Sequence, residues 1–251
     1  MAIQPTADGQ ARQRSKFAGR PGAERTESAI LIVWVPSLTD TAACLPPGEP
    51  PDLADHIAAS LADRGWCVSD DFVPPLLVSQ LRHEAHERWQ SGDFRPAGVG
   101  RGEDRQLRPD VRTDRVDWLD PAALSAAQHL YWNALEQVRL AVNRTMFLGL
   151  YDFEAHLAVY PPGSRYRRHL DQFLGIGRRH LTCILYLNDR WNDADGGQLR
   201  IYTDPDDPDA CEELLPLGGR LVTFLSARFL HEVLPARRER FSVTGWFRRR
   251  G

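Results

Sequence analysis

The chain has 251 residues, of which 42% are hydrophobic and 26% are charged, and these values are close to the averages of folded globular domains. Seven Trp, ten Phe and six Tyr supply apolar surface for a core, so the composition excludes a chain that is disordered throughout. The 31 basic and 34 acidic residues give a net charge of -3, which argues against nucleic acid or an anionic membrane surface as a partner.

The longest apolar run, residues 29–35, is far shorter than the roughly 20 residues that a membrane-spanning helix needs. Small residues at 42–44 resemble a secretory cleavage site only weakly, because Glu24 and Glu27 precede the apolar run. The four cysteines have neither C-x-x-C spacing nor the density of a disulfide scaffold. We therefore expect a cytoplasmic protein with no membrane partner.

Composition divides the chain near residue 48. Residues 1–48 are rich in Gln, Gly, Ser, Thr, Arg and Pro, and the run that follows them contains two further prolines. Such a segment buries too little apolar surface to offset the entropy of ordering. We predict a disordered tail and linker over 1–48 and one folded domain over 49–251.

The first half of this domain has helical signals. The spacing of apolar residues predicts helices over 52–61, 74–89 and 121–144, and a short strand over 66–68. Residues 95–117 are rich in Gly, Arg and Asp, and a connection of that length inside a domain is often a lid over a site.

The second half has the pattern of an antiparallel β protein. Short runs of β-forming residues alternate with Asn, Asp, Gly and Pro, and they predict strands over 153–160, 166–171, 181–187, 198–202, 220–225, 231–234 and 241–247. Strands of this length and spacing favour a sandwich or barrel over a parallel sheet.

One group of residues in these strands points to metal chemistry. Residues i and i+2 of a strand point to the same face, so His169 and Asp171 would project together. His231 opens a later strand, and Arg240 follows nine residues after it. Two His and one carboxylate are the set that holds non-heme Fe(II) with three positions open, and an Arg beside it suits a dicarboxylate cosubstrate.

Simpler interpretations exist for each residue alone. His169 and Asp171 fit a surface pair and His231 fits a core histidine, but their combination with Arg240 favours a site. Zinc could also use these ligands in a hydrolase. His83 and His86 are three residues apart, whereas a zinc helix motif needs four, so they fit a solvated helix face.

Several stretches resemble the 2-oxoglutarate and Fe(II)-dependent oxygenases, and most of all the prolyl 4-hydroxylase branch that includes the oxygen-sensing hydroxylases and their bacterial relatives. These stretches are residues 160–161, 166–169, 182–188, 196–201, 231–236 and 240–247, with weaker likeness over 65–72 and 112–118. The resemblance covers roughly residues 52–251.

The resemblance implies an α+β fold with a double-stranded β-helix, or jelly-roll, core. The core would occupy residues 150–249, and the helices of residues 52–146 would pack on one side of it. Residues 49–251 would then form a dioxygenase domain.

The resemblance also assigns roles to site residues. His169, Asp171 and His231 would bind the iron and carry the catalytic site, and Arg240 would pair with the distal carboxylate of 2-oxoglutarate. Tyr186 would donate its hydroxyl to the same carboxylate.

Three further residues are expected in the cosubstrate pocket. Tyr160 falls near another pocket tyrosine of the family, although its separation from His169 is one residue shorter than in the oxygen-sensing relatives. Thr244 and Trp246 share one face of the last strand with Arg240, because the spacing is i, i+4 and i+6.

In the family, the loop that matches residues 95–117 folds over the protein substrate. The residues expected to shape this region are Arg112, Asp114, Trp118 and Arg179. As a hypothesis, an ion pair between Asp114 and Arg179 holds the loop.

Together these inferences predict hydroxylation of a prolyl residue in a protein, with Fe(II), 2-oxoglutarate and O2, L-ascorbate as reductant, and release of succinate and CO2. Two alternatives remain open: the same chemistry on a free amino acid or small metabolite, and a jelly-roll binding module without catalysis.

Overall fold

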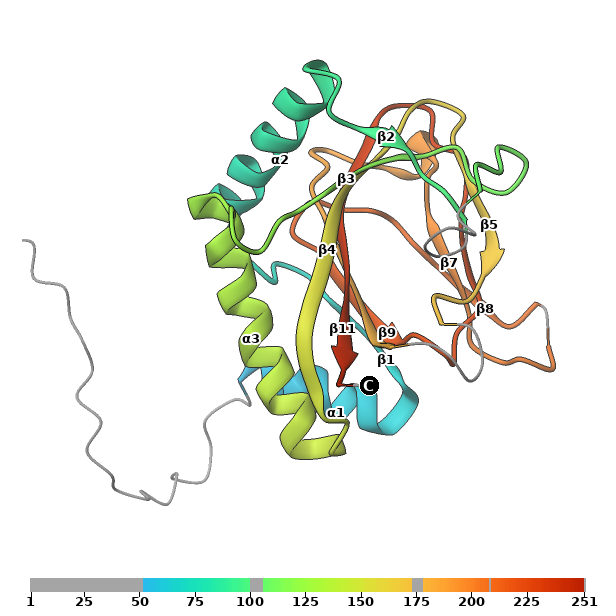
Figure 1. Cartoon of the computed structure of the whole chain (residues 1–251). Coiled ribbons are helices and arrows are strands. Elements are labelled where there is room, and N and C mark those ends of the chain that lie inside the picture. Colours follow the sequence, from blue (N-terminus) through green and yellow to red (C-terminus); the bar gives the residue numbers. More distant parts are fainter. Residues whose placement is uncertain (1–51, 100–105, 173–177, 208, 251) are drawn as a thin grey trace, which may run out of the picture. The chain divides into compact units, whose positions relative to one another are not determined.

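The computed structural model describes residues 52–99, 106–172, 178–207 and 209–250 (Figure 1). The predicted tail over 1–48 lies outside the described residues. Three α-helices are present, namely α1 (Leu53–Arg64), α2 (Pro75–Gln90) and α3 (Ala126–Met146). None of these helices is both long enough and apolar enough to cross a membrane.

Local signals set the ends of the helices. The side chain of Asp52 accepts a hydrogen bond from the Ala54 amide at the start of α1, and Gly65 ends this helix with a φ of 86°. Helix α3 starts at Ala126, later than predicted, because Ser125 and Gln128 form a capping box there.

The strands form two antiparallel sheets. The larger sheet has the order β1-β9-β6-β11-β4-β3-β2, and the smaller has the order β5-β10-β7-β8. The larger contains β1 (Trp66–Ser69), β2 (Arg95–Pro96), β3 (Arg115–Trp118), β4 (Leu150–Tyr160), β6 (Arg179–Tyr186), β9 (Leu221–Leu225) and β11 (Arg240–Arg249). The smaller contains β5 (Tyr166–His169), β7 (Leu199–Tyr202), β8 (Cys211–Leu214) and β10 (His231–Val233).

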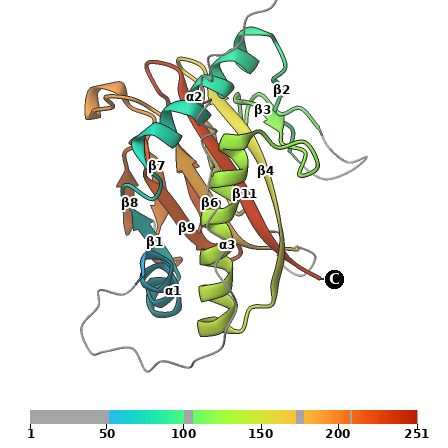
Figure 2. The same cartoon turned by 90° about the vertical axis from the view of Figure 1, so that its left-hand side faces the viewer.

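The helices lie against the outer face of the larger sheet, and Figure 2 shows α3 running across it. Strand β11 shows how the two faces of this sheet differ. Phe241, Val243 and Phe247 belong to the core that the helices cover. Arg240, Thr244 and Trp246 alternate with these residues and face the inside of the molecule, because successive side chains of a strand point to opposite faces. The predicted α+β fold with helices on one side is confirmed.

Three strands were not predicted, and the strand predicted over 166–171 ends two residues earlier. Strands β2 and β3 form in the segment that was expected to be a loop, because β3 pairs with residues His156 to Val159 of β4. Strand β8 carries two glutamates and pairs with β7. Strand β5 ends at His169, so Asp171 lies just beyond the strand and not on it.

Candidate metal centre and its cavity

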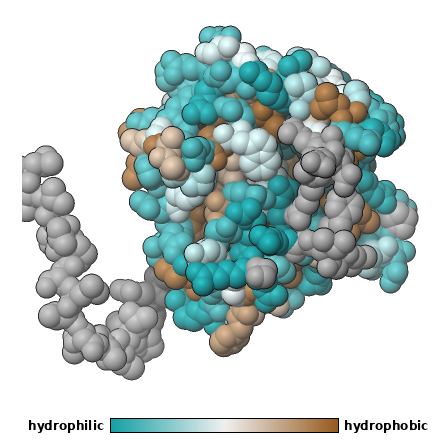
Figure 3. All heavy atoms as spheres, in the orientation of Figure 1, coloured by the Kyte–Doolittle hydropathy of each residue, from teal (hydrophilic) through white to brown (hydrophobic). Residues whose placement is uncertain are grey.

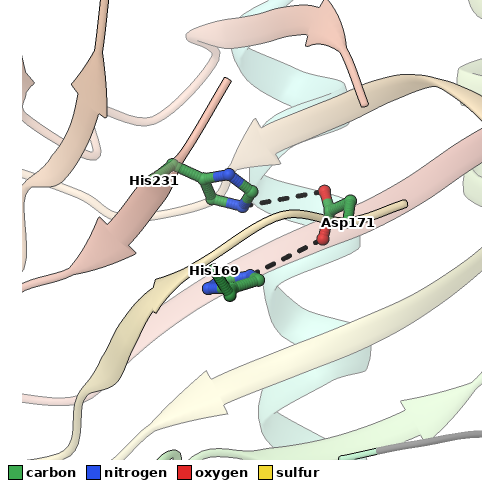
Figure 4. A group of neighbouring side chains, drawn as sticks. All are labelled: His169, Asp171 and His231. Carbon is green, nitrogen blue, oxygen red and sulfur yellow. Dashed lines mark ion pairs between the residues drawn. The ribbon is translucent and has the colours of Figure 1, made fainter. Parts of the chain in front are cut away.

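Three predicted ligands meet between the sheets. His169 ends β5 and faces His231, the first residue of β10, across an antiparallel pair. Figure 4 shows both imidazoles directed at the carboxylate of Asp171. The Nε2 atom of His169 lies 3.6 Å from Oδ1 of Asp171, and Nε2 of His231 lies 3.7 Å from Oδ2. One ligand atom from each residue lies within 4.8 Å of the others.

Backbone carbonyls determine which nitrogen of each imidazole is free. Nδ1 of His169 is 2.8 Å from the carbonyl oxygen of Arg167, and Nδ1 of His231 is 3.1 Å from that of Phe229. A carbonyl oxygen only accepts, so both Nδ1 atoms carry the proton and donate it. Both Nε2 atoms therefore keep a free lone pair that is directed at the shared site.

The charges of the group also suit a cation. Burial opposes ionisation of Asp171, but the imidazoles of His231 and His169 outweigh it and hold the pKa of the carboxyl well below its usual range. Burial, together with nearby His169, lowers the pKa of His231 to about 4. At neutral pH the site thus offers a carboxylate and a neutral imidazole, which are the forms that bind metals.

This donor set fits ferrous iron. Two imidazole nitrogens and one carboxylate match the facial set of non-heme Fe(II) sites, and within the described ranges the group has only these three members. Three protein ligands leave positions for a cosubstrate and O2.

A buried guanidinium lies in the same cavity. Arg240 is 1% exposed and stands opposite Tyr160 in the pairing of β11 with β4. Its Nε donates to the carbonyl oxygen of Gly197 at 2.8 Å, and no carboxylate of the described chain lies within 4 Å of it. A buried charge without a counter-ion is costly, so the site fits an anionic ligand.

The side chain of Tyr186 lies against Arg240, although it is not among the residues that line the cavity. The guanidinium carbon of Arg240 lies 4.9 Å from the ring centroid of Tyr186. The Tyr186 hydroxyl is buried, and it has no hydrogen-bond partner among the residues that the structure describes. Burial raises the pKa of Tyr186, so the phenol stays neutral and can donate. A guanidinium without a carboxylate partner and a hydroxyl without a hydrogen-bond partner, both among the described residues, suit a carboxylate such as that of 2-oxoglutarate.

The cavity has a volume of about 750 Å³. Figure 3 shows pale and brown spheres near the centre of one face of the molecule, with hydrophilic residues around them. The predicted site residues that line it are His169, Asp171, His231, Arg240, Tyr160, Thr244, Trp246, Arg112, Trp118 and Arg179. Asp114 and Tyr186, by contrast, are buried and do not line the cavity.

The predicted pair between Asp114 and Arg179 is wrong, because each residue has another partner. Two nitrogens of Arg112 donate to the carboxylate of Asp114, at 2.8 and 2.5 Å. Arg179 donates to Glu154 at 2.7 Å and stacks on the ring of Trp246 at 3.5 Å. Arg112 is two residues from Asp114 in one extended segment, which makes their pairing local.

Sequence reasoning missed four residues around the site. Thr182 donates a hydrogen bond to Asp171, and the hydroxyl of Ser226 is hydrogen-bonded to that of Thr182. Tyr166 stacks on the imidazole of His169 with ring centroids 3.5 Å apart. His156 lines the cavity, and its even separation from Tyr160 on one strand could have indicated this. No comparable spacing in the sequence indicates Thr182 or Ser226.

Comparisons with known proteins agree with this geometry. Residues 155–248 match the model of the 2OG-Fe(II) oxygenase superfamily. The chain is 31% identical over 205 residues to "Hypoxia-inducible factor prolyl hydroxylase" of Caenorhabditis elegans, which covers 78% of this chain and 28% of that protein. The chain thus spans less than a third of that relative.

Among the similar solved structures are two prolyl hydroxylases. A Pseudomonas putida prolyl-4-hydroxylase is 43% identical with a TM-score of 0.70, and the match covers 79% of this chain and all 100% of that one. A Trichoplax adhaerens prolyl hydroxylase, solved with a peptide fragment of a hypoxia inducible factor, is 26% identical with a TM-score of 0.68, and the match covers 78% and 89% of the two chains. The chain therefore belongs to the 2OG-Fe(II) oxygenase superfamily, in its prolyl 4-hydroxylase branch.

Proposed function

We propose that this protein hydroxylates a prolyl residue of a protein substrate and converts 2-oxoglutarate and O2 to succinate and CO2. One observation carries the proposal: the three-residue ligand group and the unpaired guanidinium of Arg240 line the same cavity. The names of the relatives support proline as the target, because the Pseudomonas putida and Trichoplax adhaerens structures described above are of prolyl hydroxylases.

The residues of the chain bind and orient the reactants. Ferrous iron, when bound by His169, Asp171 and His231, would supply the activation of O2 and the oxidation of the substrate C–H bond. Arg240 neutralises the far carboxylate of 2-oxoglutarate, and the hydroxyl of Tyr186 donates to it. Apolar side chains of the cavity wall limit the access of water.

The mouth of the cavity suits a proline ring. Trp118 is 46% exposed, and its ring centroid lies 6.2 Å from that of Trp246. The guanidinium of Arg179 covers both rings, while Glu154 balances its charge. Trp246 itself is 5% exposed, so the exposed ring of Trp118 is the surface that can hold an apolar ring without an ionic partner.

Anaerobic titration with Fe(II) and then 2-oxoglutarate tests the site. We expect a visible charge-transfer band in the wild-type chain, because a keto acid bound through two oxygens gives such a band. The variant R240A should need at least about tenfold more 2-oxoglutarate, since a charge-assisted pair contributes about 1.5–3 kcal/mol. A wild-type chain that develops no band would contradict the proposed chemistry.

The substrate class needs a second experiment. Proteins and free amino acids are incubated with the loaded enzyme and O2, and mass spectrometry follows the gain of one oxygen. A gain on peptidyl proline supports the proposal, whereas a gain on a free amino acid favours the small-molecule alternative. Succinate release that persists in D171A would show that the reaction does not use this site.

Two finer points belong to the same proposal. The resemblance to the prolyl hydroxylase branch supports L-ascorbate as the reductant that keeps the iron ferrous. We also place the reaction in the cytoplasm, because Cys67, Cys183 and Cys211 are free thiols. Assay of turnover with and without ascorbate, and fractionation of cells, would test these points.

A further inference from the structure

Two buried hydroxyls lie behind the carboxylate of Asp171. The hydroxyl of Thr182, on β6, donates to Oδ2 of Asp171 at 2.8 Å, and its oxygen lies 2.9 Å from the hydroxyl of Ser226. Both Thr182 and Ser226 are 0% exposed. The pairing of Leu181 with Leu225 brings the two segments side by side.

The direction of this hydrogen-bond chain follows from proton counting. The ionised carboxylate of Asp171 only accepts, so the single hydroxyl proton of Thr182 lies in the bond to Oδ2. The hydroxyl of Ser226 must therefore be the donor to Thr182. Each bond strengthens the next, because a hydroxyl that accepts becomes a better donor.

We propose that Thr182, supported by Ser226, is a positioning residue that keeps Asp171 a one-oxygen metal ligand. The hydrogen bond engages Oδ2, while Oδ1 stays free and lies 3.6 Å from Nε2 of His169. A carboxylate that turned to bind through both oxygens would occupy a position needed for the cosubstrate or O2. This inference rests on the proposed function of the site.

The neighbouring strand provides a matched control. Thr223, on β9, is also buried, and its hydroxyl has no hydrogen-bond partner among the described residues. It is paired with Cys183, the residue that follows Thr182. Replacement of either threonine by valine removes one hydroxyl from the same sheet, but only one of them touches a ligand.

Binding of Co(II) to the full chain, without O2, 2-oxoglutarate or substrate, tests the inference by visible absorption. We expect T182V to bind Co(II) about 10–100-fold more weakly than wild type and to shift the ligand-field bands, because loss of such an outer partner has that effect. T182S retains a hydroxyl and should stay within about threefold. T223V should match wild type in affinity and spectrum.

The outcomes separate this inference from the proposed function. A wild-type chain that binds no Co(II) would overturn both, whereas T182V that binds like wild type would overturn the positioning role alone. Equal losses in T182S and T182V would also overturn it, because the hydroxyl would then not matter. Should circular dichroism show that T182V does not fold, the variant S226A is measured in its place. A loss of Co(II) affinity of about threefold or more supports the hydrogen-bond chain from Ser226 to Asp171, and unchanged affinity contradicts it.

Discussion

A histidine with no ligand role lies in the cavity wall. The ring of His156 packs against Trp118 at 5.0 Å and Trp246 at 5.4 Å, and its Nδ1 lies 3.2 Å from the carbonyl oxygen of Leu157. Burial lowers the pKa of His156 to about 3, and the charges of Arg112 and Arg179 act in the same direction. The folded chain thus keeps this ring neutral in mild acid.

The shift makes stability depend on pH. An unfolded histidine takes up a proton below its ordinary pKa of about 6.5, whereas folded His156 resists protonation until about pH 3. The stability that the neutral His156 ring contributes is therefore fully present above pH 6.5 and decreases as the pH falls toward 3. Between pH 7 and 4.5 the free energy of unfolding of wild type should fall by about 2–3 kcal/mol more than that of H156F, as measured by urea unfolding.

The exposed His129 on α3 supplies the control. The variant H129F should lose as much stability on acidification as wild type, because that ring is exposed. Equal acid losses in H156F and wild type would show that the ring of His156 is not held neutral.

The short turn before β7 positions Arg240. Gly197 has a φ of +71°, and a Cβ there would lie 2.9 Å from Cβ of Ala236 and 3.1 Å from Cδ of Arg240. Its carbonyl also accepts from the guanidinium. The variant G197A should weaken 2-oxoglutarate binding about tenfold, since it displaces Arg240, the cation proposed to bind the far carboxylate.

Gly163 is the matched position for this prediction. It also has a positive φ, of +80°, but a Cβ there would meet nothing within 4 Å. Both variants should lose about 1 kcal/mol of stability from the strained backbone, and G197A should lose more, because its Cβ also meets Ala236. Only G197A should lose 2-oxoglutarate affinity, and equal affinities would show that the turn does not position Arg240.

The extended segment before β3 is held against β5. Thr113 donates its amide to the carbonyl of Arg165 at 3.0 Å, and the guanidinium of Arg112 covers the ring of Tyr166 at 4.1 Å. The side chains of Arg112 and Asp114 are only 13% and 0% exposed. The segment thus connects to β5 through both its backbone and a buried ion pair.

Removal of one partner should be costly. The variant R112A leaves the carboxylate of Asp114 buried without its partner, and we expect a loss of about 3–5 kcal/mol of unfolding free energy. The exposed pair of Arg108 and Asp110 makes the same type of bidentate contact, and R108A should cost far less stability than R112A, because water screens an exposed pair. Urea unfolding measures both, and similar losses would contradict the importance of burial.

At the scale of the molecule, the larger sheet separates two packed regions. The helices cover a core on its outer face, and a second apolar cluster lies on the cavity side. Leu135 of α3 is 1% exposed in the outer core, whereas Leu130 of the same helix is 55% exposed.

We expect L135A to lose about 2–5 kcal/mol of unfolding free energy, because it deletes buried methyl groups and leaves a cavity. L130A should change stability by less than about 0.5 kcal/mol. Folded L135A should bind Co(II) with wild-type affinity, since its core lies on the other face of the sheet. A weakened metal site in L135A would show that the two faces are coupled.

The period of the apolar residues was enough to predict the helices and most strands, because amphipathic patterns record which face is buried. It failed for β3 and β8, whose polar residues pair with β4 and β7 and depend on those partners. The ligand group was predictable because His169 and Asp171 are two residues apart and His231 and Arg240 follow at later predicted strands; the resemblance then assigned a role to each.

By itself, the sequence determined the residue types of the metal site, the face of β11 that carries Arg240, and the division into helical and β halves. Only the tertiary structure decided which arginine neutralises Asp114 and which hydroxyl supports Asp171. The physical reason is range. Periodicity and motif spacing describe neighbours along the chain, whereas hydrogen bonds and buried ion pairs depend on distances that arise only when strands such as β6 and β9 pair.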